Sequence, residues 1–292
     1  MGESRYKSSY LVIIPERTIP MIKIPSSFAA AINKTDHTAL GHVDVEIITA
    51  LCHEAAAVEP FPNSVCVQGP KWTQLTHEIL SELDVRDEIK VCGVGERQFP
   101  KSMLQPFVYS TGKDIAIAAL PGQVSLNEKK SDLTELIEFI DVFDMVMNVR
   151  HIVENRLEEA VLEIHSMFNI LKDQKEDPEL RVICSTGLLR DLQGEEGIQK
   201  ACLVMEMASR ENPPGGLVMK TETGFVLDAE ENKYGARIED IHLMRANLPE
   251  SVKIKASGGV SRSNVLAFVD AGADYIGASS FLRGFIPDAE SS

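Results

Sequence analysis

The sequence of 292 residues predicts an α/β protein whose strands and helices form one closed (β/α)8 TIM barrel. Short runs that are apolar throughout alternate with longer segments of 3.6-residue periodicity. This alternation is typical of parallel strands that helices cover on both faces of the sheet. Eight such alternations fit a chain of this length, which is long enough for one large core. An open dinucleotide-binding sheet would carry a glycine-rich fingerprint after its first strand, and the sequence has none there.

The strands are predicted in order along the chain. The first is expected near Ile32–His37, where the apolar pattern is weakest. The seven clearer runs are Ser64–Val67, Ile115–Leu120, Phe143–Met147, Val182–Cys184, Leu217–Lys220, Val252–Lys255 and Tyr275–Ala278. Between them, helical periodicity is clearest in Val45–Ala57, Leu133–Phe139, Ile152–Leu171 and Gly197–Met207.

The predicted organisation is a single barrel with short additions. Residues 1–30 are interpreted as an N-terminal extension, 31–286 as the barrel and 287–292 as a short tail. An irregular stretch near 85–111 is interpreted as an insertion within the barrel. The sequence Pro-Pro-Gly-Gly at 213–216 is typical of a tight helix-to-strand turn.

Composition and charge narrow the class of protein. A net charge of −15 disfavours nucleic acid or an anionic membrane as the main partner, because both would be repelled. A local basic pocket for a phosphorylated substrate is compatible with this charge. No apolar leader or membrane-length run is present, so we expect a cytoplasmic location. The cysteines include no CxxC pair, which favours buried thiols in a reducing compartment: Cys52, Cys66, Cys92, Cys184 and Cys202.

Polar residues at the carboxyl ends of the predicted strands are the candidate reactive groups, because barrel enzymes place their active sites there. Asp144 lies in Val-Phe-Asp-Met-Val, Lys220 closes Leu-Val-Met-Lys, and Lys255 closes Val-Lys-Ile-Lys. Ser279 follows the last strand in Gly-Ala-Ser-Ser. A single lysine here would most simply be a surface group. Two lysines and a carboxylate on three strands favour chemistry.

Two lysines at neighbouring strand ends are expected to repel each other. At about 4 Å and an effective dielectric constant of ~20, the repulsion is roughly 4 kcal/mol. Because ~1.4 kcal/mol corresponds to one pKa unit, this repulsion is expected to lower the pKa of one of the two lysines by several units, toward neutrality. A neutral amine attacks a carbonyl carbon, whereas an ammonium group does not.

Two glycine-containing turns follow the last two predicted strands, Lys-Ala-Ser-Gly-Gly at 255–259 and Gly-Ala-Ser-Ser at 277–280. Barrel enzymes commonly bind phosphate there with backbone amides and a helix N-terminus. Either turn alone fits an ordinary connection, but the two together favour a phosphate site. The seven histidines are dispersed, and no His, Cys or Asp cluster has the spacing of a metal site, so no metal is expected.

A series of motifs resembles the 2-deoxyribose-5-phosphate aldolase family, whose members are class I aldolases that work through a Schiff base. The similarity extends from about residue 33 to residue 284. The motifs are Thr-Asp-His-Thr-Ala-Leu (35–40), Ala-Leu-Cys-His-Glu-Ala (50–55), Ser-Val-Cys-Val (64–67), Phe-Asp-Met-Val-Met-Asn (143–148), Met-Lys-Thr-Glu-Thr-Gly-Phe (219–225), Ile-Lys-Ala-Ser-Gly-Gly (254–259) and Gly-Ala-Ser-Ser (277–280).

The resemblance implies a carbon-carbon lyase of deoxyribonucleotide catabolism. Such an enzyme reversibly cleaves 2-deoxy-D-ribose 5-phosphate to D-glyceraldehyde 3-phosphate and acetaldehyde, without a cofactor. By resemblance Lys220 forms the Schiff base, Lys255 assists it, and Asp144 moves protons. The residues implied to hold the phosphate are Gly224, Gly258, Gly259, Gly277 and Ser279, and those implied to line the rest of the pocket are Cys66, Asp36 and Thr38.

Three departures from the family pattern bear on activity. Glu222 stands where the family usually has serine, two residues after Lys220 and on the same side of an extended strand. Ser185 stands where the family usually has glutamate, and Arg262 is shifted by one position. A carboxylate at Glu222 is expected to raise the pKa of Lys220 and to repel the phosphate of a substrate.

These departures keep a second function open at this stage. A catalytically weakened barrel would act mainly as a protein-binding scaffold, for example for the actin cytoskeleton, by fold-level analogy with another aldolase family. Residues 1–30 or the stretch 85–111 would then contact the partner. A homo-oligomer is also open, whereas nucleic acid and membranes are not expected partners. The retained lysines and aspartate favour the active enzyme.

Overall fold

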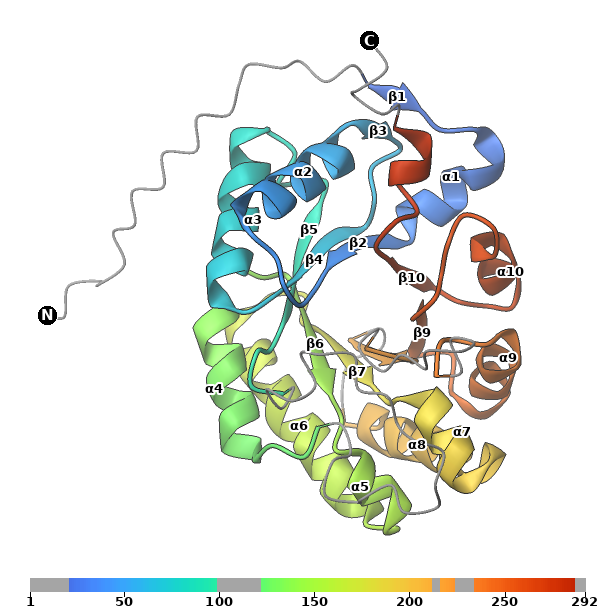
Figure 1. Ribbon diagram of the computed structural model, residues 1–292. Helices are drawn as coiled ribbons and strands as arrows, with labels where there is room; N and C mark the ends of the chain where they lie inside the picture. Colours follow the sequence, from blue (N-terminus) through green and yellow to red (C-terminus); the bar gives the residue numbers. More distant parts are fainter. Residues whose placement is uncertain (1–20, 99–121, 212–215, 224–233, 287–292) are drawn as a thin grey trace, which may run out of the picture.

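Eight parallel strands close into a barrel in the computed structural model, which describes residues 21–98, 122–211, 216–223 and 234–286 (Figure 1). Each strand pairs with the next along the chain, and the last pairs with the first to close the sheet. This confirms the predicted (β/α)8 barrel. The strands are β2 (Thr35–Ala39), β4 (Ser64–Gln68), β5 (Lys90–Val94), β6 (Val142–Val146), β7 (Glu179–Ile183), β8 (Leu217–Lys220), β9 (Lys253–Ser257) and β10 (Tyr275–Ala278).

Helices lie outside the ring of strands (Figure 1). The predicted segment Ile152–Leu171 spans two helices, because Asn155 adopts a positive φ of 58° and ends the first of them. No helix within the described ranges combines the length and apolarity that a membrane span requires. The helices are α1 (Ser26–Asn33), α2 (Val45–Ala56), α3 (Pro70–Glu82), α4 (Leu126–Leu136), α5 (Val149–Val153), α6 (Leu157–Gln174), α7 (Thr186–Gln193), α8 (Glu195–Ser209), α9 (Ile238–Asn247) and α10 (Val265–Asp270).

Local sequence signals explain where several helices begin. The Asp44 side chain accepts a hydrogen bond from Ile47 N at 2.8 Å and so caps α2. Ser125 and Glu128 form a reciprocal capping box at the start of α4. Pro70 stands in the first turn of α3, where its missing N–H costs no hydrogen bond. These residues determine where α2, α3 and α4 begin.

The strands are buried on both faces, which explains their continuous apolar runs. The larger core lies between strands and helices, with Phe143, Met145 and Leu180 among its members. A smaller apolar cluster lies in the barrel interior, separate from this core. Its members are Cys66, Cys92, Val94, Val142, Val146 and Ile183. Buried charged side chains, Asp144 and Lys255 among them, lie beside it. The barrel interior therefore offers an apolar side and a charged side to one site.

The third barrel strand differs from its predicted position. β5 occupies Lys90–Val94, inside the stretch 85–111 that was interpreted as an irregular insertion. The run at 115–120 lies outside the described residues. Gly93 interrupts the apolar pattern, because a Cβ at this position would lie 2.7 Å from Ile140 Cγ2. Because α4 and the loop after it pack tightly against β5, position 93 is a glycine, and the continuous apolar run that would have predicted the strand is interrupted.

Part of the expected N-terminal extension is ordered structure. The short strand β1 (Ile22–Lys23) pairs with β3 (Val58–Glu59), and α1 buries Ile32 fully. Residues 32–33 therefore end a helix, and the first barrel strand begins later, at Thr35. The ring of Phe28 in α1 lies 6.1 Å from that of Phe281, beyond β10. Residues 1–20 and 287–292 lie outside the described ranges.

Candidate active site

Asp144, Lys220 and Lys255 point into the barrel interior from three different strands. Lys220 is the last residue of β8, as predicted for a strand end. Asp144 and Lys255 are each the third of five residues in β6 and β9, and so lie deeper than predicted. Lys220 is 1% exposed, and the other two side chains are fully buried. Lys220 and Lys255 are direct partners across β8 and β9, which brings their amino groups together.

A single carboxylate oxygen holds both lysines. Lys220 Nζ donates to Asp144 Oδ2 at 2.6 Å, and Lys255 Nζ donates to the same oxygen at 3.1 Å. The expected direct repulsion between two ammonium groups is therefore offset in this arrangement, because an anion touches both of them. The sequence predicted the lysine pair but placed no carboxylate between its members.

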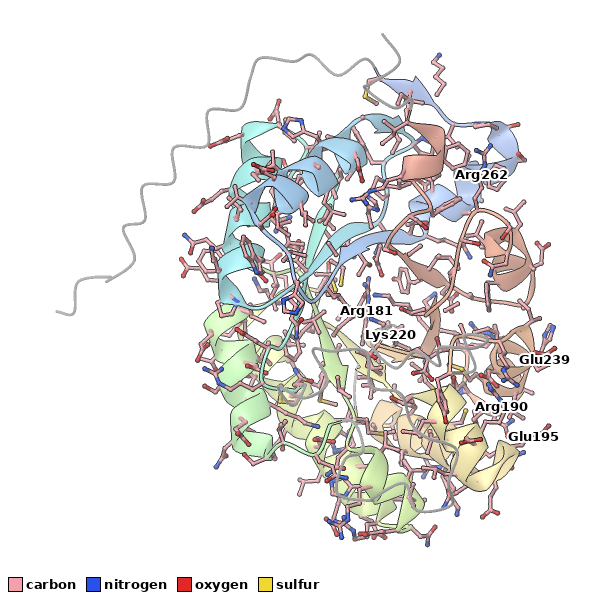
Figure 2. All side chains as sticks on the ribbon, viewed as in Figure 1. Arg181, Arg190, Glu195, Lys220, Glu239 and Arg262 are labelled. Atoms are coloured by element: carbon pink, nitrogen blue, oxygen red, sulfur yellow. The ribbon has the colours of Figure 1, made fainter. Side chains whose placement is uncertain are left out.

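A second buried carboxylate extends this cluster. Asp36 Oδ2 lies 2.7 Å from Lys255 Nζ and accepts a hydrogen bond from Arg181 at 2.6 Å. Its other oxygen accepts from Ser64 Oγ at 2.6 Å. Arg181 also donates to Glu179 at 2.6 Å, and its Nη1 lies 4.0 Å from Asp144 Oδ1. Figure 2 labels Arg181 and Lys220 within the ring of strands. Three buried carboxylates thus face three buried cations.

The electrostatic environment keeps Asp144, Asp36 and Lys255 ionised. Burial alone would raise the pKa of Asp144, but the neighbouring cations Lys220, Lys255 and Arg181 hold it well below its usual value. The pKa of Asp36 is lowered for the same reason, since Arg181 and Lys255 outweigh its burial. Burial would lower the pKa of Lys255, but Asp144 and Asp36 raise it. Asp144 and Lys255 therefore form a stable ion pair beside Lys220.

The two turns that were predicted to bind phosphate follow the carboxyl ends of β9 and β10. Gly258 and Gly259 have positive φ values of 96° and 73°, which favour glycine and leave the backbone uncovered. Ser279 is exposed just beyond β10. Gly277 is required by the interior, because a Cβ there would lie 3.2 Å from Lys255 Cε. Gly224 falls outside the described residues.

The remaining pocket residues line β2 and β4. Cys66 is fully buried in the interior. Thr38 is the register partner of Cys66 on the adjacent strand and is partly buried, with its hydroxyl donating to Asp36 O at 2.9 Å. The structure thus brings Asp36 and Cys66 close to the lysine pair and leaves Thr38 nearer the mouth of the barrel.

Glu222 does not present a free anion to Lys220. Its Oε1 accepts a hydrogen bond from Gly187 N at 2.6 Å, in the first turn of α7. Ser185 cannot cap that helix, because it adopts a left-handed φ of 53° and its hydroxyl finds no partner among the described residues. Burial, partly offset by the Gly187 amide and by Arg190, raises the pKa of Glu222 to about 8. At pH 7 the group is therefore mostly protonated, and the expected repulsion of phosphate is absent.

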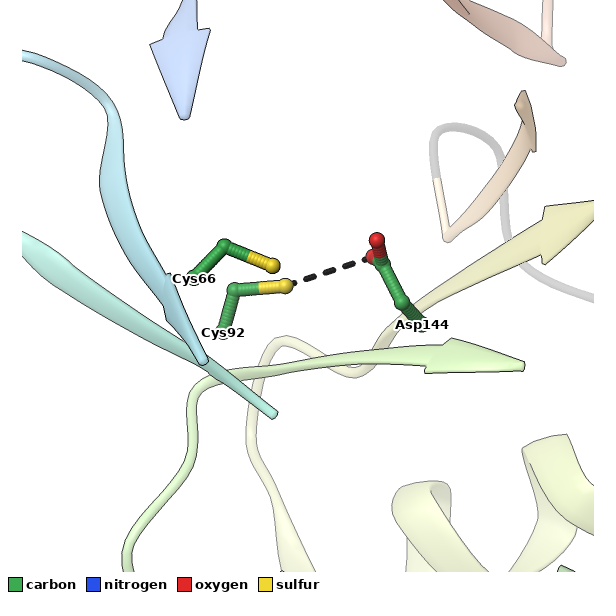
Figure 3. A group of neighbouring side chains, drawn as sticks. All are labelled: Cys66, Cys92 and Asp144. Carbon is green, nitrogen blue, oxygen red and sulfur yellow. Dashed lines mark hydrogen bonds between the residues drawn. The ribbon is translucent and has the colours of Figure 1, made fainter. Parts of the chain in front are cut away.

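Two cysteines also face Asp144 (Figure 3). Cys66 and Cys92 are register partners on β4 and β5. Cys92 Sγ donates to Asp144 Oδ1 at 3.3 Å. The two sulfur atoms and one Asp144 oxygen all lie within 4.8 Å of one another, and all three residues are buried. The three residues are far apart in the sequence, so their juxtaposition was not visible from sequence spacing.

Sequence reasoning missed Arg181, Glu179 and Cys92 as parts of the site. A usable signal was present for the first two, because Glu179 and Arg181 stand two apart in a buried strand and therefore face the same side. The strand was predicted to begin at Val182, which left both residues out. Cys92 was recognisable only from the register of β5, a strand that the sequence did not reveal.

Comparison with known proteins decides the family. No family model matches the chain. Deoxyribose-phosphate aldolase 1 of Bacillus licheniformis is 32% identical over 260 residues, which cover 87% of this chain and 96% of that protein. The chain belongs to the deoxyribose-phosphate aldolase family. The deoxyribose-phosphate aldolase of Caldanaerobacter subterraneus is likewise 30% identical over 265 residues, with 90% and 95% of the two chains covered.

Solved structures support the fold of this member of the deoxyribose-phosphate aldolase family. A Coccidioides immitis protein described as a candidate deoxyribose-phosphate aldolase superimposes with a TM-score of 0.64 at 23% identity, covering 92% of this chain and 91% of that one. A similar candidate from Toxoplasma gondii gives a TM-score of 0.64 at 18% identity, covering 89% and 92%. The family resemblance predicted from the motifs is confirmed by the curated relatives.

Proposed function

We propose that this chain is a class I aldolase that reversibly cleaves 2-deoxy-D-ribose 5-phosphate to D-glyceraldehyde 3-phosphate and acetaldehyde. The relatives that are 30–32% identical over most of the chain carry the name of this activity. The observation that carries the proposal is the placement of Lys220 Nζ 2.6 Å from Asp144 Oδ2, with Lys255 on the same oxygen. A buried lysine with its own proton acceptor is what Schiff-base chemistry requires.

In the cleavage direction, the amine of Lys220 adds to the C1 aldehyde of the open-chain sugar and forms a carbinolamine. Loss of water gives an iminium ion, which accepts the electron pair of the C2–C3 bond as that bond breaks. The C3 hydroxyl gives up its proton and becomes the aldehyde of D-glyceraldehyde 3-phosphate. The enamine left on Lys220 takes a proton at C2, and hydrolysis releases acetaldehyde and the free lysine.

Asp144 and Lys255 manage the protons of these steps. Attack requires the uncharged amine of Lys220, and the nearest acceptor for its proton is Asp144 Oδ2. Lys255 stays an ammonium group because Asp144 and Asp36 raise its pKa despite burial. This fixed positive charge holds Asp144 in place when Lys220 becomes neutral. The backbone amides near Gly258 and Gly259 would bind the phosphate end.

Reductive trapping tests the proposal. Incubation with acetaldehyde and borohydride should leave one ethyl group on Lys220, detected by mass spectrometry of peptides. Lys220→Met should abolish both this adduct and cleavage of deoxyribose 5-phosphate. Lys253→Met is the matched control, since Lys253 lies on the neighbouring strand β9 with 43% of its side chain exposed. Equal labelling of Lys220→Met, or no adduct on the folded parent protein, would contradict the proposal.

The scaffold alternative receives no support from the residues that the structure describes. It depended on residues 1–30 and on the stretch 85–111 as partner-binding additions. The described part of that stretch, up to residue 98, contains barrel strand β5. The described part of the extension packs against the barrel through α1.

A further inference from the structure

The thiols of Cys66 and Cys92 form a pair that the proposed aldol chemistry does not use. They stand opposite each other on adjacent strands and point to the same side of the sheet (Figure 3). Arg181 Nη1 lies 3.8 Å from Cys92 Sγ, and both cysteines also belong to the small apolar cluster. Buried cysteines are commonly packing residues, but here both sulfur atoms face a carboxylate oxygen instead of aliphatic carbon alone.

We propose that Cys66, Cys92 and Asp144 bind one thiophilic divalent cation, of which Zn²⁺ and Cd²⁺ are examples. Around a tetrahedral zinc ion with two sulfur ligands and one oxygen ligand, the ligand atoms lie about 3.5–3.8 Å apart. Cys92 Sγ lies 3.3 Å from Asp144 Oδ1, slightly closer than this range, and all three ligand atoms fall within 4.8 Å of one another, so small side-chain shifts would complete the site. The fourth position is left to water.

Charge balance favours this ion in spite of the cations nearby. Binding exchanges two thiol protons for one divalent cation, because thiolates are the metal ligands. The cluster of two thiols and one carboxylate carries one negative charge before the exchange and one afterwards. Lys220, Lys255 and Arg181 therefore face the same net charge in both states. Electrostatic repulsion between a metal ion and the buried cations is therefore offset by the negative charge of the two thiolates.

The two oxygens of Asp144 separate the metal site from the lysines. Oδ1 faces Cys92, whereas Oδ2 accepts from Lys220 and Lys255. An ion on Oδ1 leaves both lysine contacts in place and withdraws electron density from the carboxylate. Asp144 then accepts the proton of Lys220 less readily, so bound metal should slow the aldolase. This consequence rests on the proposed function, while binding of the ion does not.

Titration of the full chain with Cd²⁺ tests binding directly. One ion should bind per chain, with the ultraviolet sulfur-to-cadmium absorption of two thiolates and release of two protons. Cys92→Ala should lower the affinity at least tenfold and halve this absorption. Cys202→Ala is the matched control, because Cys202 is an equally buried thiol on α8 and should leave both quantities unchanged. Excess Mg²⁺ should not compete, since it prefers oxygen ligands.

Several results would overturn the site. Binding by Cys92→Ala that equals the parent, displacement of Cd²⁺ by Mg²⁺, or no binding at micromolar Cd²⁺ would each do so. Circular dichroism shows whether Cys92→Ala is folded, and Cys92→Ser serves as a second variant of similar size. Activity is measured separately, as the ratio of rates with and without Zn²⁺ for each variant. An inactive parent protein that binds Cd²⁺ through Cys92 would reject the aldolase proposal and keep the metal site.

Discussion

Glu222 shows how a single substituted position is explained by its neighbours. Two of the three departures from the family pattern, Ser185 and Glu222, are connected in the structure. Ser185 adopts a left-handed conformation and leaves the start of α7 uncapped, while Glu222, two residues beyond the end of β8, accepts a hydrogen bond from Gly187 N. The carboxyl group of Glu222 thus binds the backbone of a neighbouring helix, which explains how it is tolerated two residues from Lys220.

The protonation of Glu222 predicts a pH-dependent stability. Its pKa is raised from 4.5 to about 8 in the folded protein, chiefly by burial. The folded state keeps this proton where the unfolded state has lost it, so stability falls as pH rises between these two values. From about pH 5 to about pH 8 the loss is at most roughly 4 kcal/mol, at ~1.4 kcal/mol per pKa unit.

Glu222→Gln should remove this dependence, because the amide oxygen still caps α7 and carries no titratable proton. Urea unfolding at a series of pH values measures the free energy of unfolding of both proteins. The variant should gain stability relative to the parent as pH rises, whereas Glu222→Ser, which is too short to reach Gly187, should be less stable throughout. Parallel pH profiles for the parent and Glu222→Gln would show that Glu222 does not carry the buried proton.

Some site residues were predictable from sequence and others were not. Lys220, Lys255 and Asp144 stood out because charged side chains interrupt or close apolar strands. The strands that carry the two lysines are neighbours in the predicted order, because the alternating pattern predicts a barrel in which each strand pairs with the next along the chain. Asp144 touching both lysines was not predictable, since that contact depends on side-chain length and on register across the barrel. Cys92 was hidden by a strand whose pattern Gly93 interrupts.

At the scale of elements, β10 constrains the side chain of Lys255 on its neighbour β9. Gly277 lies beside Ser257, and a Cβ at this position would lie 2.7 Å from Ser257 Oγ and 3.2 Å from Lys255 Cε. Such contacts are too close for a well-packed interior, so an added Cβ would force both the Ser257 and the Lys255 side chains to move. A glycine in a strand thus marks the place where a functional side chain passes close to the backbone.

Gly277→Ala is therefore expected to displace the Lys255 amino group and to lower kcat at least tenfold. Stability should fall by about 1–3 kcal/mol, the usual cost of an overpacked core. Gly284→Ala is the matched control, because its Cβ would meet no described atom closer than 3.5 Å. Steady-state cleavage of deoxyribose 5-phosphate separates two roles of Gly277. A change in KM alone, with kcat intact, would mean that Gly277 serves the phosphate and not Lys255.

At the scale of the whole molecule, buried charges connect strands that are distant in the sequence. Arg181 on β7 joins Asp36 on β2 across the barrel, and Lys255 on β9 joins the same carboxylate. Tyr275 on β10 donates to Glu179 at 3.1 Å and stacks beneath the guanidinium of Arg181 at 4.8 Å. The interior that holds the proposed catalytic groups thus also contains ion pairs and hydrogen bonds that link distant strands of the closed sheet. Removing one member should affect stability as well as catalysis.

Arg181→Met tests this connection between site and stability. Within the described part of the chain, the substitution leaves Asp36 with Lys255 as its one close cation and leaves Glu179 with the Tyr275 hydroxyl, both in the interior. Breaking a buried ion network from one side costs about 3–5 kcal/mol, because uncompensated charge stays buried. Arg210→Met should change stability by less than ~0.5 kcal/mol, since Arg210 pairs with Glu206 on the surface of α8.

The double variant Arg181→Met/Glu179→Leu separates two causes of the destabilisation. One is the loss of the attraction between Arg181 and the carboxylates, and the other is the burial of carboxylates that no longer have a cation beside them. If the second cause dominates, removing Glu179 as well should recover at least ~1 kcal/mol of the free energy of unfolding, because one uncompensated carboxylate disappears. Urea unfolding of the single and double variants measures the difference. A double variant no more stable than Arg181→Met, or a single variant that loses less than ~1 kcal/mol, would mean that the barrel closes by apolar packing and strand pairing alone. The charged interior would then serve catalysis without holding the strands together.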